Sequence, residues 1–207
     1  MENKDLLKDL RDIRTMMERS SRFQVVSGWG ILAAGIMALV AVWVANSIFS
    51  GCDSTLYGNT DYIWAHKTQI AVSGTLVLLV VCGLIIFFSS MLMARRRNIP
   101  FAFDATMRRL LVAFSVPLAA GGVLCLALVL QGHYGLTSSI MLIFYGLALI
   151  ACHHFTYPAL GLLGYAELLL GLADCFTVTH ALVFWAVGFG VLHVLFGIYL
   201  ILKSRRA

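Results

Sequence analysis

The sequence predicts an all-α protein: a polytopic bundle of about six transmembrane helices, with both termini cytoplasmic (N-in/C-in) and a short amphipathic helix at the N-terminus. Three observations predict this fold. Hydrophobic residues make up 60% of the 207 residues and charged residues only 12%, whereas a soluble domain carries about 25% charged residues. The mean hydropathy is +0.90. Long uncharged stretches separate the charges, and most of the basic residues gather between alternate stretches.

Six stretches are apolar enough to be membrane helices, because a bilayer core of about 30 Å needs about 20 apolar residues. They are Phe23 to Ser50, Thr68 to Ala94, Leu110 to Leu130, Leu136 to Phe155, Pro158 to Ala173 and Ala181 to Leu202. The fifth is the shortest and contains Glu167. We expect three parts: a cytoplasmic arm (1–22), a membrane domain (23–203) and a cytoplasmic tail (204–207).

The distribution of lysine and arginine predicts the orientation. Of the 15 basic residues, six lie in the arm, five between the second and third stretches and three after the last stretch, from Lys203 to Arg206. The first connection contains Lys67, and the other connections contain none. Positive residues stay on the cytoplasmic side during insertion, so both termini are predicted to be cytoplasmic. The net charge of +5 therefore reflects membrane topology, and we expect a lipid bilayer rather than nucleic acid as partner.

The arm reads as a helix with a narrow apolar stripe. The apolar residues are Leu6, Leu10, Ile13 and Met17, spaced 4-3-4. Charged residues occupy the other faces of this helix. The pattern favours a cytoplasmic helix packed on the bundle or lying at the interface. The alternative is a docking helix, in which residues 2–22 bind a cytoplasmic protein partner. A homo-oligomer is left open.

Two ionisable residues stand out well inside the predicted spans, Glu167 and His193. Such residues are costly in a bilayer and are functional candidates by default. Glu167 shares a helical face with Gly161, Gly164, Gly171 and Asp174, and His193 shares one with Ala186, Gly190 and Gly197. Small residues let membrane helices approach closely. We expect these faces to pack against each other or a third helix, forming a polar seam inside the bundle.

The depth of the two residues predicts an indirect contact. Measured from the connection between the last two spans, Glu167 and His193 differ by six residues, an axial offset of about 9 Å. This offset favours a water molecule or another helix as the bridge, with Tyr165 and Trp185 as partners at nearer depth. The first interpretation of Glu167 is a hydrogen-bonded structural acid, and the alternative is a proton-carrying or ligand-binding acid.

Metal or haem binding is a weaker interpretation. His66, His133 and His180 fall at the outer ends of helices with several carboxylates, a chemically suitable transition-metal set, but their spacing matches no motif. A bis-histidine haem pairing His193 with His153 or His154 would require similar depths, which the sequence does not provide. HExxH, GxSxG and phosphate-binding loop motifs are absent from the sequence, so the cofactor is unknown. A disulfide between Cys52 and Cys175 on the outer side is geometrically conceivable.

Several strings are similar to those of a known family: Asp12 to Phe23 (DIRTMMERSSRF), Val116 to Gly122 (VPLAAGG) and Phe184 to His193 (FWAVGFGVLH). They resemble small six-helix bacterial inner-membrane proteins for which no activity is established. The resemblance covers most of the chain. It implies a multi-pass protein of the bacterial inner membrane and implies no reaction.

Three function classes follow from the sequence. The favoured one is a non-enzymatic sensor that binds a partner or a lipophilic ligand, because the arm can dock and catalytic motifs are absent. The second is a small proton-coupled transporter or channel that uses Glu167 and His193. The third is a membrane-embedded metal or haem protein.

Overall fold

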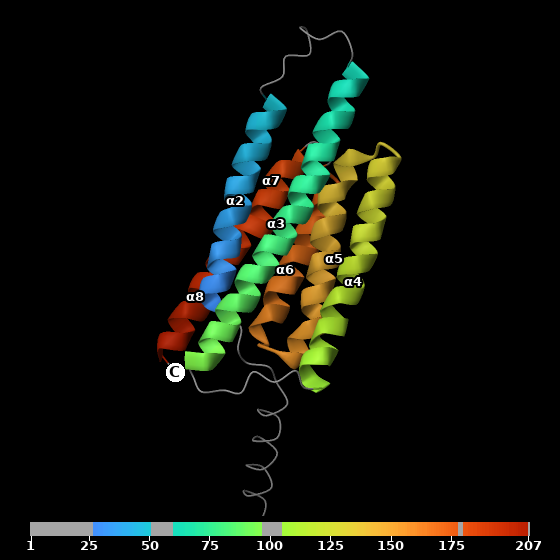
Figure 1. Ribbon diagram of the computed structural model, residues 1–207. Helices are drawn as coiled ribbons and strands as arrows, with labels where there is room; N and C mark the ends of the chain where they lie inside the picture. The colour runs from blue at the N-terminus through green and yellow to red at the C-terminus, as the bar shows by residue number, and fades with distance from the viewer. Residues whose placement is uncertain (1–26, 51–59, 97–104, 178–179, 207) are drawn as a thin grey trace, which may run out of the picture.

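The computed structural model describes residues 27–50, 60–96, 105–177 and 180–206, and every regular element in these ranges is helical (Figure 1). Five elements are single helices: α2 (Gly28–Ser50), α3 (Thr60–Arg96), α4 (Ala105–Leu130), α5 (Thr137–Cys152) and α6 (Ala159–Asp174). A sixth and last helix is a run of three segments: α7 (Ala181–Trp185), the π-helical turn η4 (Ala186–Leu192) and α8 (His193–Arg206). Short 3₁₀ turns, η1 (Tyr134–Leu136) and η2 (His153–Phe155), precede and follow α5.

Within the described part of the chain, five helical segments are long and apolar enough to cross a membrane. The all-helical prediction is confirmed. Helix α6 is not among the five candidate spans, because its 16 residues fall short of the roughly 20 that a typical span requires. Several predicted boundaries differ from the structure, and two of them move basic residues from a connection or tail into a helix. Helix α3 begins at Thr60, so Lys67 lies in a helix rather than a connection, and α8 continues to Arg206 through most of the predicted tail.

The helices pack as two groups that meet at the last one. In one group α5 lies between α4 and α6, and in the other α2 lies between α3 and the η4–α8 part of the last helix. Contacts of α7 and η4 with α5 and α6 join the groups. Figure 1 shows the helices side by side and roughly parallel to one long axis. The last helix is therefore placed to bring its side chains against α5 and α6.

Glycines set the closest helix approaches. A Cβ atom on Gly164 would lie 2.8 Å from the carbonyl oxygen of Gly146, where α6 meets α5. Similarly, a Cβ atom on Gly197 would lie 2.7 Å from the backbone nitrogen of Leu32, where α8 meets α2. The same holds for Gly161 against His153, Gly171 against Ile143 and Gly190 against Leu39. Each predicted glycine face thus packs on a third helix: α5 in the case of α6, and α2 in the case of the last helix.

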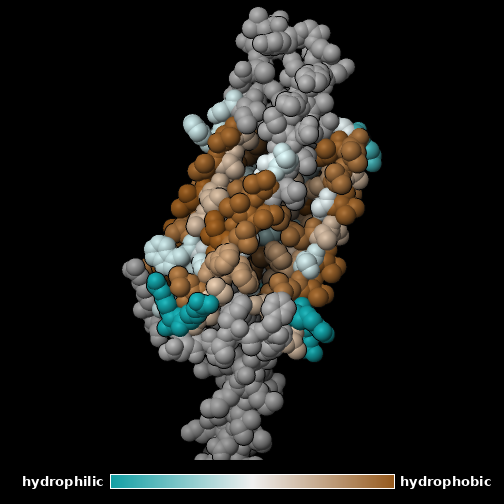
Figure 2. Space-filling model, viewed as in Figure 1, coloured by the Kyte–Doolittle hydropathy of each residue, from teal (hydrophilic) through white to brown (hydrophobic). Residues whose placement is uncertain are grey.

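The outer surface is apolar along most of its height, and exposed cations gather at one end. Arg95 and Arg96 end α3, Arg108 and Arg109 begin α4, and Lys203 lies near the end of α8. In Figure 2 the hydrophilic colour concentrates at this end, below a broad hydrophobic band. We call it the basic end. The opposite end, where α6 finishes and α5 and α7 begin, is called the far end.

Candidate functional site: a buried glutamate, histidine and tyrosine

Glu167 lies midway along α6 on the face that turns inward. Its side chain is 0% exposed. The same face carries Gly164 and Gly171, whose lack of side chains lets α6 approach α5 closely. The sequence therefore places a carboxyl group in the tightest packed part of the bundle.

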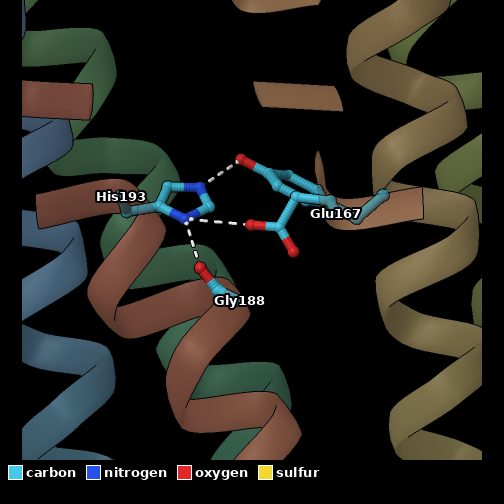
Figure 3. Close-up of polar contacts among 4 residues, drawn as sticks. Glu167, Gly188 and His193 are labelled. Atoms are coloured by element: carbon cyan, nitrogen blue, oxygen red, sulfur yellow. Dashed lines mark hydrogen bonds and ion pairs between the residues drawn. The ribbon is translucent and has the colours of Figure 1, made fainter. Parts of the chain in front are cut away.

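His193 begins α8, directly after the π-helical turn η4. Its Nδ1 lies 3.0 Å from the carbonyl oxygen of Gly188, and its Nε2 lies 2.8 Å from the hydroxyl of Tyr145 on α5 (Figure 3). A carbonyl can only accept a hydrogen bond, so Nδ1 carries a hydrogen. In the neutral imidazole Nε2 is then the acceptor, and Tyr145 donates to it. The two neighbours of His193 thus select one tautomer.

Glu167 and His193 are in direct contact. The distance from Glu167 Oε1 to His193 Nδ1 is 3.4 Å (Figure 3). The prediction of an indirect contact is therefore wrong, because the two side chains meet without a bridge. The estimated offset of about 9 Å assumed a regular α-helix, whereas hydrogen bonds in the π-helical turn span five residues rather than four.

The glutamate carboxyl has no hydrogen-bond donor of its own. Neither Oε1 nor Oε2 has a hydrogen-bond partner among the described residues. The Nδ1 hydrogen of His193 is donated to the Gly188 carbonyl at 3.0 Å, and Glu167 Oε1 lies 3.4 Å from the same nitrogen. A buried carboxylate without donors costs several kcal/mol. The first interpretation of Glu167, a hydrogen-bonded structural acid, does not describe this geometry.

Gly188 makes room for the carboxyl. A Cβ atom there would lie 2.6 Å from Glu167 Oε2 and 2.4 Å from Leu142 Cδ2. Gly188 therefore contributes in two ways: its carbonyl oxygen accepts from His193, and its lack of a side chain leaves room for the Glu167 carboxyl. Since π-helical turns within α-helices often occur at functional sites, η4 marks this site independently of the ionisable groups.

Aromatic rings enclose the cluster. The Phe189 ring lies 5.2 Å from that of Tyr145 and 6.1 Å from that of His193, measured between centroids. The predicted seam residue Trp185 reaches the cluster through Phe189, at a centroid distance of 5.0 Å. Tyr165 does not belong to the seam, because its side chain is 53% exposed. The sequence prediction missed Tyr145, whose only sequence signal is a hydroxyl inside an otherwise apolar stretch.

Asp174, the remaining predicted seam residue, lies two turns beyond Glu167 at the far end. Its side chain is 0% exposed, as is that of Ser139 on α5. The Ser139 hydroxyl donates to Asp174 Oδ2 over 2.9 Å. Asp174 Oδ1 has no partner among the described residues. The seam thus contains two separate polar groups rather than one.

The predicted metal and haem ligands do not come together in the described residues. No group of three or more His, Cys, Asp or Glu suited to a metal occurs there. The side chain of His66 lies outside the described part, and those of His133 and His180 are exposed. His153 and His154 contact each other at the basic end, with ring centroids 3.8 Å apart. Cys175 is a free thiol, and Cys52 and the arm lie outside the described residues.

Comparison with protein-family models, with curated proteins and with solved structures found no match for this chain. The site therefore has to be interpreted from its own chemistry. Its groups are a buried carboxyl, a buried imidazole and a partly buried phenol, midway along the helices.

Proposed function

We propose that this chain is an integral membrane protein that moves protons, as a small proton-coupled transporter or channel, with Glu167 and His193 as its proton-binding groups. The observation that carries the proposal is the buried carboxyl of Glu167, which lacks hydrogen-bond partners and lies 3.4 Å from an imidazole nitrogen. Ionisable groups that face one another inside membrane bundles typically form proton relays.

The orientation of the imidazole supports a defined relay. His193 faces an oxygen on each side, the Tyr145 hydroxyl at Nε2 and the Glu167 carboxyl near Nδ1. Tyr145 passes its hydroxyl hydrogen to Nε2 and takes the incoming proton in its place, so the ring becomes imidazolium. Nδ1 then passes its own hydrogen to the Glu167 carboxylate, so that one proton enters the relay and one reaches Glu167.

Gly188 supports the return of the ring to its starting state. After the transfer, the Nδ1 lone pair would face the Gly188 carbonyl oxygen, which lies 3.0 Å away in the present geometry. Two acceptors facing each other repel, so this carbonyl favours renewed protonation at Nδ1. Return to the starting tautomer requires Nδ1 to take up one proton and Nε2 to release one.

The other functions proposed from the sequence have less support. Partner sensing depends on residues 2–22, which lie outside the described part, and remains a prediction. No arrangement among the described residues favours lipophilic-ligand, metal or haem binding over proton movement.

We further propose a multi-pass location in a bacterial inner membrane, with both termini cytoplasmic. The exposed cations at the basic end support this orientation, because Lys and Arg remain on the cytoplasmic side. The resemblance of the Asp12 to Phe23 string supports the bacterial inner membrane. Helix α6 would then lie in the bilayer core beside longer helices that cover its shorter length.

The experiment is a proton-flux assay in liposomes of phosphatidylethanolamine and phosphatidylglycerol that contain a pH-sensitive dye. A potassium gradient with valinomycin supplies the driving voltage. The wild type is expected to acidify the lumen faster than empty liposomes, and Glu167→Gln to be at least about tenfold slower. Leu169→Ala is the matched control, since Leu169 lies on the same helix and is 67% exposed. No flux in the wild type, or equal flux in Glu167→Gln, contradicts the proposal.

A further inference from the structure

The far-end group of Asp174 and Ser139 is not used by the relay described above. Asp174 Oδ2 accepts from Ser139, whereas Oδ1 is buried without a partner among the described residues. The next residues along the chain, Phe176 and Thr177, are exposed. Asp174 is therefore a fully buried carboxyl within two residues of the molecular surface.

Asp174 and Glu167 lie seven residues apart on the same face of α6. Seven residues correspond to an axial separation of about 10 Å. This distance is too long for a direct proton transfer. Whether a proton can pass between the two carboxyls therefore depends on what lies between them.

Leu142 occupies that space. It follows Ser139 and precedes Tyr145 on α5 at steps of three residues, so all three lie on one side of the helix. Its side chain is 0% exposed. A Cβ atom on Gly171 would lie 2.9 Å from Leu142 Cβ, and one on Gly188 would lie 2.4 Å from Leu142 Cδ2. Leu142 therefore lies against α6 and η4, between the two polar groups.

We propose that Asp174 is a second proton-binding site, the exit carboxyl on the far side, and that Leu142 is the hydrophobic barrier between it and Glu167. This inference deepens the proposed function and rests on it. A proton bound at Glu167 passes to the Asp174 carboxylate when Leu142 moves aside. Glu167 is left as the carboxylate, ready to accept the next proton from His193, and Asp174 becomes the acid.

The Leu142 barrier and the Asp174 carboxyl have distinct roles. An apolar side chain between two proton sites excludes water and prevents a continuous leak. The other titratable groups with described side chains at the far end are Cys125, His133, Cys175 and His180.

The test uses the full chain in the same liposomes, with three variants. Asp174→Asn keeps the shape and the Ser139 contact; it is expected to slow proton flux about tenfold without lowering the unfolding temperature. Leu142→Val, which shortens the barrier, is expected to raise the passive proton leak several-fold. Leu149→Val is the matched control, since Leu149 is also buried on α5 but lies toward the basic end.

Infrared difference spectra between two pH values supply a readout that a structural role would not change. The wild type should show a carboxyl band that disappears in Asp174→Asn and is retained in Glu167→Gln. The inference is overturned if Asp174→Asn keeps that band and the wild-type flux, or if the two valine variants leak equally. Unchanged flux in Glu167→Gln would instead overturn the proposed function, so the two failures are distinguishable.

Discussion

Gly188 and Glu167 occupy the same small volume: a Cβ atom built on Gly188 would lie 2.6 Å from Glu167 Oε2. No real Cβ atom comes so close to a carboxyl oxygen. The carboxyl can reach the imidazole of His193 only because residue 188 has no side chain. The π-helical turn η4 supplies both this gap and the carbonyl that orients the ring.

Gly188→Ala should therefore impair proton flux while leaving the fold intact. The new methyl group meets the ends of two side chains, Leu142 and Glu167, and these can shift. Alanine also favours the helix by up to about 1 kcal/mol relative to glycine. We expect flux to fall about tenfold and the unfolding temperature in detergent to change little. The control is Gly83→Ala on α3, where a Cβ atom meets nothing within 4 Å; equal flux in both variants would contradict this role of Gly188.

Gly164→Ala should instead destabilise the protein. Its Cβ atom would meet the Gly146 carbonyl oxygen at 2.8 Å and Leu149 Cβ at 2.9 Å, and backbone cannot move aside without separating α5 from α6. Overpacking of this kind costs about 1–3 kcal/mol. Thermal unfolding in detergent micelles, followed by circular dichroism, measures the loss. Gly122→Ala, with no atom within 4 Å of its Cβ position, should unfold like the wild type. A Gly164→Ala protein as stable as Gly122→Ala would show that the packing at this crossing is loose.

The glycine-rich face of α6 illustrates what the sequence could predict. Gly164, Glu167 and Gly171 recur at helical spacing, which predicts a buried face with the carboxyl turned inward. The partner of that face could not be predicted, because spacing along one helix does not specify which neighbour packs on it. Tyr145 was missed for this reason, since it becomes part of the site only through the contact of α5 with α6 and η4.

The direct contact of Glu167 with His193 could not be predicted either. A depth estimate assumes a regular α-helix, and the π-helical turn between Ala186 and Leu192 breaks that assumption. The turn depends on packing of the whole bundle rather than on the propensity of its residues. The early start of α3 at Thr60 has a related cause, because hydropathy detects the apolar core of a helix and not its polar extension.

Tyr145→Phe should release the imidazole from one of its two hydrogen bonds. The hydroxyl donates to His193 Nε2 over 2.8 Å, and its loss leaves a buried nitrogen without that partner. We expect destabilisation of about 1 kcal/mol. Nitrogen-15 NMR of labelled histidine should show His193 with hydrogen on Nδ1 in both proteins, and a shifted Nε2 signal in Tyr145→Phe because that nitrogen has lost its hydrogen-bond donor. A wild-type spectrum with hydrogen on Nε2 alone would contradict the assigned geometry.

Thiol labelling tests the proposed orientation. In a background without the five native cysteines, Ala207→Cys places a thiol at the C-terminus and His133→Cys places one at the far end. A membrane-impermeant maleimide added to sealed vesicles of known orientation should label position 207 from the cytoplasmic side only. Position 133 should label from the opposite side. Labelling of both positions from one side would contradict a C-terminus and far end separated by the bilayer.

The central claim is that Glu167 binds and releases a proton inside the bundle. Infrared difference spectroscopy on the protein in lipid, cycled between mildly acid and mildly alkaline buffer, measures this directly. We expect a reversible carboxyl band that is absent in Glu167→Gln and shifts in position when His193→Gln removes the neighbouring imidazole. A carboxyl spectrum that is the same in the wild type and in Glu167→Gln would mean that Glu167 does not exchange its proton, and would contradict its role as a proton-binding group.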